Sequence, residues 1–256
     1  MQFPDGEPPP VKAYPVNPEE GITFILEGDL RVVNPRTGLS QARKQSYIFG
    51  QPSCRQDLVL SSHFRFIHVR FESGTLYRLF RLPIGRELHQ PIEAAALFGA
   101  NFSALEERLK NADYVETPAL LDQFFRQVTS HRRWYPSPFD QVPIWMRHHP
   151  GYFNLGKMAS DACMSERHFE KKFICQVGVR PKLYARINRF YEAYLLKERQ
   201  PQRDWLSVAL DFNYSDYQHL VKDFRQFAGG NPNALLKAAG LNPERRLRLA
   251  PGFVGV

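Results

Sequence analysis

The feature that most constrains this fold is a repeat of about 50 residues in the C-terminal part of the chain. When the sequence is shifted by 51 positions, identical residues coincide at several places. Two copies are too few for a solenoid. The sequence therefore predicts one supersecondary unit that is used twice. The coinciding pairs include His168 with His219, Lys171 with Lys222, Phe173 with Phe224, Gly178 with Gly229, and Pro181 with Pro232.

Each copy has the start and stop signals of a helix-turn-helix. Asn154 and Asp204 stand where an N-cap side chain accepts hydrogen bonds from free backbone N–H groups. A short helix and a turn follow, and Ser165 and Asp216 then begin a second helix. That helix ends before a glycine, and a proline three residues later begins the next element. We therefore predict one helix-turn-helix unit in each copy.

A long helix is predicted between the two copies, over residues 182–199. Its apolar side chains Leu183, Ile187, Phe190 and Tyr194 form one stripe at helical spacing. Such a helix would hold the two units at a fixed separation. Because the same face of the major groove recurs about every 34 Å, two recognition helices on one rigid rod could enter successive turns of DNA.

The charge is concentrated in the same part of the chain. Residues 1–145 contain 16 Lys and Arg and 16 Asp and Glu, whereas residues 146–256 contain 18 and 10. The second part therefore carries the whole net charge of +8. This asymmetry is typical of a polyanion-binding module joined to a neutral domain. A basic, well-solvated surface without a nucleic-acid partner is the alternative.

Two segments resemble a known family. The string from Tyr214 to Phe224 is close to the second-motif signature of the AraC/XylS transcription regulators. Leu155–Ala159 followed by Ser165–Phe169 resembles the first motif, and the match covers about residues 139–240. The resemblance implies a sequence-specific DNA-binding regulator with a variable, β-rich sensor domain before the DNA-binding module.

The turn of each unit departs from the family pattern. The residue that is usually glycine is Cys163 in the first unit and Asn213 in the second. Asn tolerates a positive φ, and Cys does so less readily. We therefore expect the first unit either to be strained or to use a different turn.

The recognition helices supply six base-reading residues on this resemblance, and we assign three further arginines to phosphate. Arg or Lys can donate to guanine, Gln can pair with adenine, and Glu can accept from cytosine. A solvated helix face is the alternative for each residue, and a structural hydrogen bond is a further one for the equivalent histidines His168 and His219. The base-reading set is Arg167, Glu170, Lys171, Gln218, His219 and Lys222, and the phosphate set is Arg180, Arg186 and Arg189.

The first half of the chain predicts a small antiparallel β sandwich or barrel followed by helices, so the fold class is α+β. Short runs of period two with turn signals between them occupy residues 22–71, and the period becomes helical after Gly74. Two or three helices are expected within residues 92–133. The predicted organisation is an extended lead-in (1–20), a β-rich sensor or association domain with a helical extension (21–133), a linker (134–138), the double helix-turn-helix domain (139–240) and a tail (241–256).

The β-rich domain faintly resembles cupin-like sensor domains. We expect no metal site and no cofactor, because His63 and His68 are five residues apart and would face opposite sides of one regular strand. Its aromatic residues could line a small-molecule pocket or form the sandwich core. These residues are Phe24, Tyr47, Phe49, Phe64, Phe66 and Phe71.

The sequence thus predicts a transcription regulator and not an enzyme, since none of the common catalytic motifs is present. The expected partners are double-stranded DNA, a small-molecule effector, a second copy of the chain and RNA polymerase. Three cysteines without a CxxC pair, and no apolar run near 18 residues, predict a cytoplasmic protein without a membrane partner. The alternatives are a cupin-type ligand- or metal-binding protein or enzyme with an accessory helix-turn-helix, and an interaction protein whose helix-turn-helix is degenerate.

Overall fold

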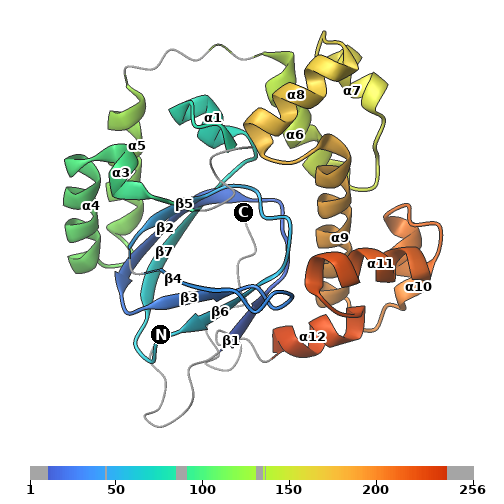
Figure 1. The fold of residues 1–256 in the computed structure, drawn as a ribbon, viewed down its shortest axis with the longest axis horizontal. Helices are drawn as coiled ribbons and strands as arrows, with labels where there is room; N and C mark the ends of the chain where they lie inside the picture. The colour runs from blue at the N-terminus through green and yellow to red at the C-terminus, as the bar shows by residue number, and fades with distance from the viewer. Residues whose placement is uncertain (1–10, 44, 85–90, 131–134, 136, 241–256) are drawn as a thin grey trace.

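A computed structural model of the chain describes residues 11–43, 45–84, 91–130, 135 and 137–240. Two four-stranded antiparallel sheets form the N-terminal part (Figure 1), with strand orders β1-β6-β3-β4 and β7-β2-β5-β8. The first sheet contains β1 Val11–Tyr14, β3 Leu30–Val33, β4 Ser40–Arg43 and β6 Gln56–Leu60. The second contains β2 Glu20–Glu27, β5 Tyr47–Phe49, β7 Arg65–Phe71 and β8 Ile92–Glu93.

The predicted antiparallel sandwich is confirmed, but the sequence pattern does not predict β1, β4 or β8. β1 lies within the predicted lead-in and pairs with β6 over Val11–Tyr14. β4 has the polar sequence Ser-Gln-Ala-Arg at the edge of its sheet, so it lacks the alternation of apolar residues that marks a strand. β8 has only two residues. Pairing with neighbouring strands, rather than local pattern, defines all three.

β2 is buried on both faces, because successive side chains of a strand point to opposite sides. Ile22 and Phe24 pack with the helices outside the second sheet. Ile25 packs with Leu30 and Leu60 between the two sheets. One strand therefore joins the core under the helices to the core of the sandwich.

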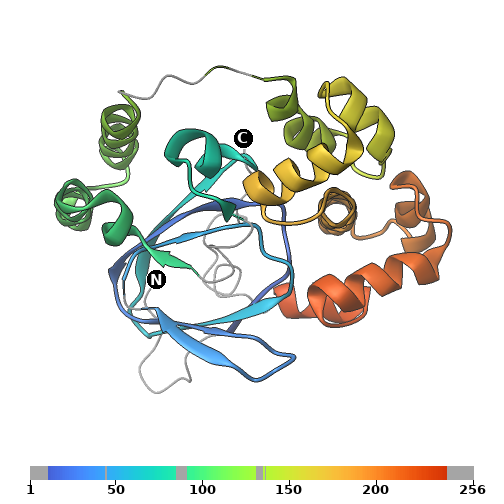
Figure 2. The ribbon, with the colours of Figure 1, turned by 45° about the horizontal axis from the view of Figure 1, so that its top comes forward.

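Within the described residues, four helices belong to the N-terminal domain. α1 approaches the helical domain, whereas α3, α4 and α5 cover the outer face of the second sheet (Figures 1 and 2). The prediction of two or three helices within residues 92–133 is confirmed. The bounds are α1 Thr75–Phe80, α3 Ala94–Phe98, α4 Ala100–Asn111 and α5 Thr117–Thr129.

The C-terminal domain is helical, as predicted. α9 is its long central helix, with one helix pair at each end (Figure 1). We call α7 and α8 the first unit and α10 and α11 the second unit. The bounds are α6 Pro138–His148, α7 Leu155–Asp161, α8 Glu166–Val177, α9 Pro181–Arg199, α10 Trp205–Asp211, α11 Tyr217–Ala228 and α12 Pro232–Gly240.

Some predicted boundaries lie outside the described residues. They include residues 1–10 of the lead-in, Trp134 and Pro136 of the linker, and the whole tail, 241–256. Ser137 is described and caps α6, because its side chain and that of Asp140 form a capping box. The helical domain therefore begins at the end of the predicted linker.

The sandwich and the helical domain share an interface beside each unit. Near the first unit, the Tyr184 hydroxyl donates a buried hydrogen bond of 2.8 Å to Ser73 Oγ. Near the second unit, the backbone N–H of Val16 donates to the carbonyl of Phe227 at 3.1 Å. Val16 is fully buried in the apolar cluster of the second unit. The N-terminal domain thus contacts the helical domain beside both units.

Candidate DNA-binding surface and effector cavity

The first unit is capped as its sequence predicts. Asn154 Oδ1 accepts from the backbone N–H of Lys157 at 2.9 Å, and Ser165 Oγ accepts from that of His168 at 3.4 Å. α8 ends at Gly178, which has a φ of 94°. A side chain at Gly178 would also collide with Ile84, since an ideal Cβ there lies 2.6 Å from Ile84 Cγ2.

The second unit repeats this pattern. Asp204 Oδ1 accepts from the backbone N–H of Ser207 at 2.9 Å, and Asp216 Oδ1 accepts from that of His219 at 2.7 Å. α11 ends at Gly229, which has a φ of 72°. The N-caps on which the prediction of two helix pairs was based are therefore present in both units.

The turns of the two units have the same conformation. Cys163 has a φ of 55° and Asn213 a φ of 57°, so both residues occupy the left-handed region. In each unit the next residue donates its backbone N–H to the carbonyl of the alanine in the first helix: Met164 to Ala159 at 2.9 Å, and Tyr214 to Ala209 at 3.0 Å. Of the two alternatives for the first unit, the structure has the strained form, since Cys163 adopts the conformation that glycine accepts more readily.

The second helix of each unit, α8 or α11, is its predicted recognition helix. These two helices carry pairs of polar side chains at equivalent positions. Arg167 and Lys171 are exposed on α8, and Gln218 and Lys222 are exposed on α11. Each pair is spaced i, i+4, so its members lie on one face of their helix. The 51-residue shift superposes the two pairs. Glu170, which is half-buried, lies beside the pair on α8.

His219 differs from the other predicted base-reading residues, because both ring nitrogens have partners within the protein. Arg189 Nη2 lies 3.1 Å from His219 Nε2, and Ser215 Oγ lies 3.2 Å from Nδ1. A guanidinium can only donate, so Nε2 of the neutral ring accepts and the proton is on Nδ1. His168, the equivalent residue of the first unit, is exposed.

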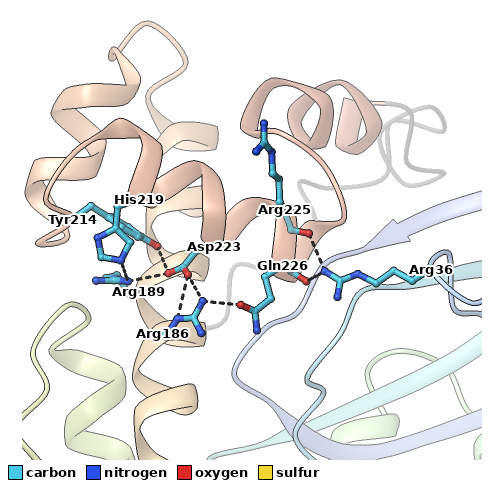
Figure 3. A network of polar contacts seen from close by, with 8 residues as sticks. All are labelled: Arg36, Arg186, Arg189, Tyr214, His219, Asp223, Arg225 and Gln226. Carbon is cyan, nitrogen blue, oxygen red and sulfur yellow. Dashed lines mark hydrogen bonds and ion pairs between the residues drawn. The ribbon is translucent and has the colours of Figure 1, made fainter.

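A buried carboxylate lies one turn beyond His219 (Figure 3). Asp223 is only 1% exposed, and it pairs with Arg186 at 2.5 Å and with Arg189 at 2.9 Å. The Tyr214 hydroxyl donates to Asp223 Oδ2 at 3.1 Å, and burial together with the charge of Asp223 raises the pKa of Tyr214. Arg189 also lies over the Tyr214 ring, 3.9 Å from its centroid.

This network gives two of the predicted phosphate-binding arginines partners inside the protein. The side chain of Arg189 is 13% exposed and that of Arg186 is 33% exposed, and both face α11. Arg180, the third, is exposed at the N-cap of α9. Asp223 is not among the residues singled out from the sequence. Its one signal is an acidic residue in a basic helix, at the position that Lys172 occupies in the first unit.

A cavity of about 320 Å³ lies between the sandwich and α9. Tyr191 and Tyr194 of α9 form one wall, and residues from strands of both sheets form the others. The six aromatic residues singled out in the sequence are divided between the two alternatives. Phe24 and Phe71 pack with the helices outside the second sheet. The cavity is lined by Tyr47, Phe49, Phe64 and Phe66.

The cavity wall also contains a charged cluster. Glu19 is 3% exposed, accepts a 2.6 Å hydrogen bond from the Tyr14 hydroxyl and lies 3.6 Å from His68 Nε2. Burial favours the protonated form of Glu19, but His68, Tyr14 and Arg70 outweigh it and lower the pKa of the carboxyl. Lys12 and Arg70 also line the cavity, so both signs of charge are present.

Within the part of the chain that the structure describes, no group of three or more His, Cys, Asp or Glu side chains could hold a metal ion. No described helix is both long and apolar enough to cross a membrane.

This arrangement of a sandwich and two helix-turn-helix units matches solved structures. The 1.65 Å structure of ToxT from Vibrio cholerae has a TM-score of 0.52 and 11% identity, over 91% of this chain and 95% of that chain. ToxT from strain SCE256 with an unsaturated fatty acid bound has a TM-score of 0.51 and 9% identity, over 93% of each chain. The DNA-binding domain of AdpA, solved with a target DNA, is 26% identical with a TM-score of 0.38, over 46% of this chain and 100% of that chain.

No protein-family model matches the chain, and no curated protein matches it in sequence. The chain has the architecture of two helix-turn-helix units on one linker helix, preceded by an N-terminal β domain. It shares the fold of ToxT, an AraC-family protein, over most of its length, which confirms the resemblance at the level of the fold.

Proposed function

We propose that this protein is a non-enzymatic, sequence-specific DNA-binding transcription regulator. The observation that carries the proposal is the pair of equivalent recognition helices on one linker helix, with exposed Arg167 and Lys171 on α8 and exposed Gln218 and Lys222 on α11. Each pair lies in the N-terminal half of its helix, which is the part that contacts base edges in helix-turn-helix proteins. The net charge of the second half of the chain, +8, favours the approach of DNA.

The side chains divide into three roles. Arg167, Lys171 and Lys222 donate to guanine, Gln218 pairs with adenine, and Glu170 accepts from cytosine or orients a neighbouring cation. Arg180, which is exposed, contacts phosphate. Three of the residues with predicted DNA contacts are proposed instead to hold α11 against α9, because each has side-chain atoms with partners within the protein: Arg186, Arg189 and His219.

The cavity is the proposed site of a small-molecule effector. Its volume, about 320 Å³, lies in the range of ligand pockets, and aromatic walls with a few placed charges are typical of such sites. A ToxT structure holds an unsaturated fatty acid, which supports an amphipathic effector for a protein of this fold. Because α9 forms one wall, a bound effector would touch the helix that carries both units.

The test is selection of genomic DNA fragments by the purified full-length chain, at ~150 mM salt so that nonspecific phosphate binding is weak. We expect a motif with two blocks about 10 base pairs apart, one for each unit. Arg167→Ala with Lys171→Ala should remove the information in one block, and Gln218→Ala with Lys222→Ala that in the other.

The control is Lys110→Ala, which removes a positive charge from α4, on the N-terminal domain. It should leave both blocks intact. Failure to enrich any sequence would overturn the proposed function and favour an interaction protein with a degenerate helix-turn-helix. Enrichment that both pairs of substitutions reduce equally, without loss of either block, would overturn the base-reading roles.

A further inference from the structure

The C-terminal turn of α11 ends on the β sandwich. Arg36, in the β3–β4 hairpin, donates from Nη2 to the backbone carbonyl of Arg225 at 2.9 Å and to that of Gln226 at 2.5 Å. Arg55 Nη1 donates to the carbonyl of Ala228 at 2.9 Å. We call Arg36, Arg55 and the backbone N–H of Val16, which bonds the Phe227 carbonyl, the sandwich clamp.

These contacts satisfy the groups that a helix cannot satisfy itself. The last four carbonyls of an α-helix have no partner within the helix. In α11 four successive carbonyls, 225 to 228, each accept from the sandwich clamp. The two guanidinium groups also place positive charge at the negative end of the helix dipole. α8 is different, because Gly178 closes its last turn with a bond to Ile174 in the same helix.

The sandwich clamp continues into the network beneath the recognition surface. Gln226 Oε1 accepts from Arg186 Nη2 at 2.7 Å, and Arg186 pairs with the buried Asp223. Asp223 in turn holds Arg189, which contacts His219. Figure 3 shows this unbroken path of polar contacts from the hairpin to the first turns of α11.

The sandwich clamp acts at the end of α11 that is remote from the proposed base-reading residues. α11 has 12 residues and is therefore roughly 18 Å long. Gln218 and Lys222 lie in its first half and stay exposed. The sandwich therefore orients the second recognition helix without covering the surface that would meet DNA.

The sandwich clamp is also adjacent to the cavity. Two of its residues are flanked in sequence by cavity-lining residues: Val16 by Pro15 and Asn17, and Arg55 by Cys54 and Gln56. A molecule that occupies the cavity would touch the neighbours of both residues. Displacement of either strand end would move a donor away from the α11 carbonyls.

We propose that the sandwich clamp fixes the orientation of the second recognition helix relative to the first, and that occupancy of the cavity acts on DNA binding through it. This proposal rests on the proposed function for its DNA part. The orientation of α11 would then depend on the sandwich, whereas that of α8 depends on packing within the helical domain and against α1. The regulated variable would be the spacing between the two DNA blocks that the full chain accepts.

The first experiment compares Arg36→Ala combined with Arg55→Ala against the control Arg31→Ala, which removes an exposed arginine from β3 of the same sheet. Amide hydrogen exchange of the full chain is measured in α11. Loss of the capping bonds should speed exchange in the last turn of α11 about fivefold, with no change in α8 and none in the control. Unchanged exchange in the double variant would overturn the sandwich clamp, whether or not the chain binds DNA.

The second measurement uses DNA in which the two blocks are moved apart or together by one and two base pairs. The wild type should prefer one spacing, and the double variant should lose at least about threefold of that preference while it binds a single block normally. An unchanged preference would overturn the role of the sandwich clamp in orientation. Absence of any specific binding by the wild type would instead overturn the proposed function, and the exchange result would still stand.

The third measurement tests the cavity. Leu58→Trp adds volume to a cavity-lining residue of β6, and Val32→Phe does the same from β3 in case the first variant does not fold. Either substitution should change exchange in the last turn of α11 when the sandwich clamp is intact. The effect should be lost when Arg36 and Arg55 are alanine. The same effect in both backgrounds, or none in either, would overturn the coupling.

Discussion

The two helix-turn-helix units have the same caps and turns, but the recognition helices rest on different interiors. α8 packs through aromatic rings, with Phe169 5.4 Å from Phe139 and Phe173 5.6 Å from Tyr184 between centroids. α11 also has an apolar core, and it adds the buried carboxylate of Asp223 between two arginines of α9.

This difference shows which features of a unit depend on local sequence, namely its caps and its turn, and which depend on the helix that it packs against. Caps and a left-handed turn residue are required by the ends of the helices, so they recur in both units. The residues packed beneath each recognition helix need only exclude water and provide partners for any buried polar group, so they can differ between the units. Hydrogen bonds are directional, whereas apolar contact is not, so Asp223 defines the position of α11 on α9 more narrowly than aromatic packing defines that of α8.

The largest expected effect comes from removing that carboxylate. Asp223→Ala leaves Arg186 and Arg189 without their anion and should destabilise the chain by about 3–5 kcal/mol, as is usual when one partner of a buried ion pair is lost. Denaturant unfolding of the full chain checks this. Asp211→Ala is the control, because its pair with Arg203 is about one third exposed and contributes at most about 1 kcal/mol. Equal losses for the two variants would show that the network does not stabilise α11.

A second prediction concerns the contact between the N-terminal domain and the first unit. Glu20 is 1% exposed, it accepts from the backbone N–H of Leu76 at 2.7 Å at the start of α1, and α1 packs on α8. Burial raises the pKa of Glu20 to about 8. Because the folded state binds this proton more tightly than the unfolded state, the free energy of unfolding is higher when the pH is below the unfolded pKa of Glu20. This contribution to stability is lost as the pH rises toward 8.

Glutamine cannot ionise, so the Glu20→Gln variant should lack the loss of stability that the wild type shows as the pH rises. Between pH 5 and pH 9 the wild type should lose on the order of 3 kcal/mol relative to the variant. Urea unfolding at pH 5, 7 and 9 measures the difference, with exposed Glu93→Gln as the control. If wild type and Glu20→Gln have parallel pH profiles, Glu20 does not ionise in this range.

The elements that sequence analysis could predict are those with local signals. Asn154 and Asp216 act as caps because their side chains reach the next turn of their own helix. The strand from Glu20 to Glu27 is apolar on both faces, so its pattern is strong. β4 is a polar edge strand, and only pairing with β3 identifies it.

The buried network could not be predicted, because its members are far apart in sequence. Arg186 and Asp223 are separated by 37 positions and belong to different helices. The sequence predicts phosphate contacts for Arg186 and Arg189, because a basic residue on a predicted helix has no visible partner in the sequence. For a related reason, the sequence left open whether the aromatic residues form the core or line a cavity. The alternation of apolar and polar residues shows that Phe24 and Tyr47 are on strands, but it does not show which face of the sheet is covered by helices.

The proposed base-reading residues allow a direct comparison of the units. Lys171→Ala and Lys222→Ala should each weaken specific DNA binding by about 1–3 kcal/mol and relax sequence preference in only one block. Binding to the selected sites and to random DNA should be measured side by side. Equal losses on both kinds of DNA would assign that lysine to phosphate instead.

The salt dependence of binding separates the exposed arginine from the buried one. Arg180→Ala should lower the slope of log K against log salt by about one, because one phosphate contact is lost. Arg189→Ala should leave the slope unchanged, although it weakens binding by loosening α11. A slope that falls by about one in Arg189→Ala would return this residue to the phosphate set.

The smallest expected effect tests the shared turn. Cys163 and Asn213 have the same positive φ, but Asn accepts that conformation more readily than Cys. Cys163→Gly should stabilise the chain by up to about 1 kcal/mol, since the relief of strain exceeds the entropy that glycine adds to the unfolded state. Asn213→Gly should be close to neutral. Cys163→Ala removes the thiol and keeps a Cβ, so it should bring no gain in the midpoint of thermal unfolding. If Cys163→Ala stabilised the chain as much as Cys163→Gly, the thiol and not the backbone would be the source of strain, and the two turns would no longer be equivalent.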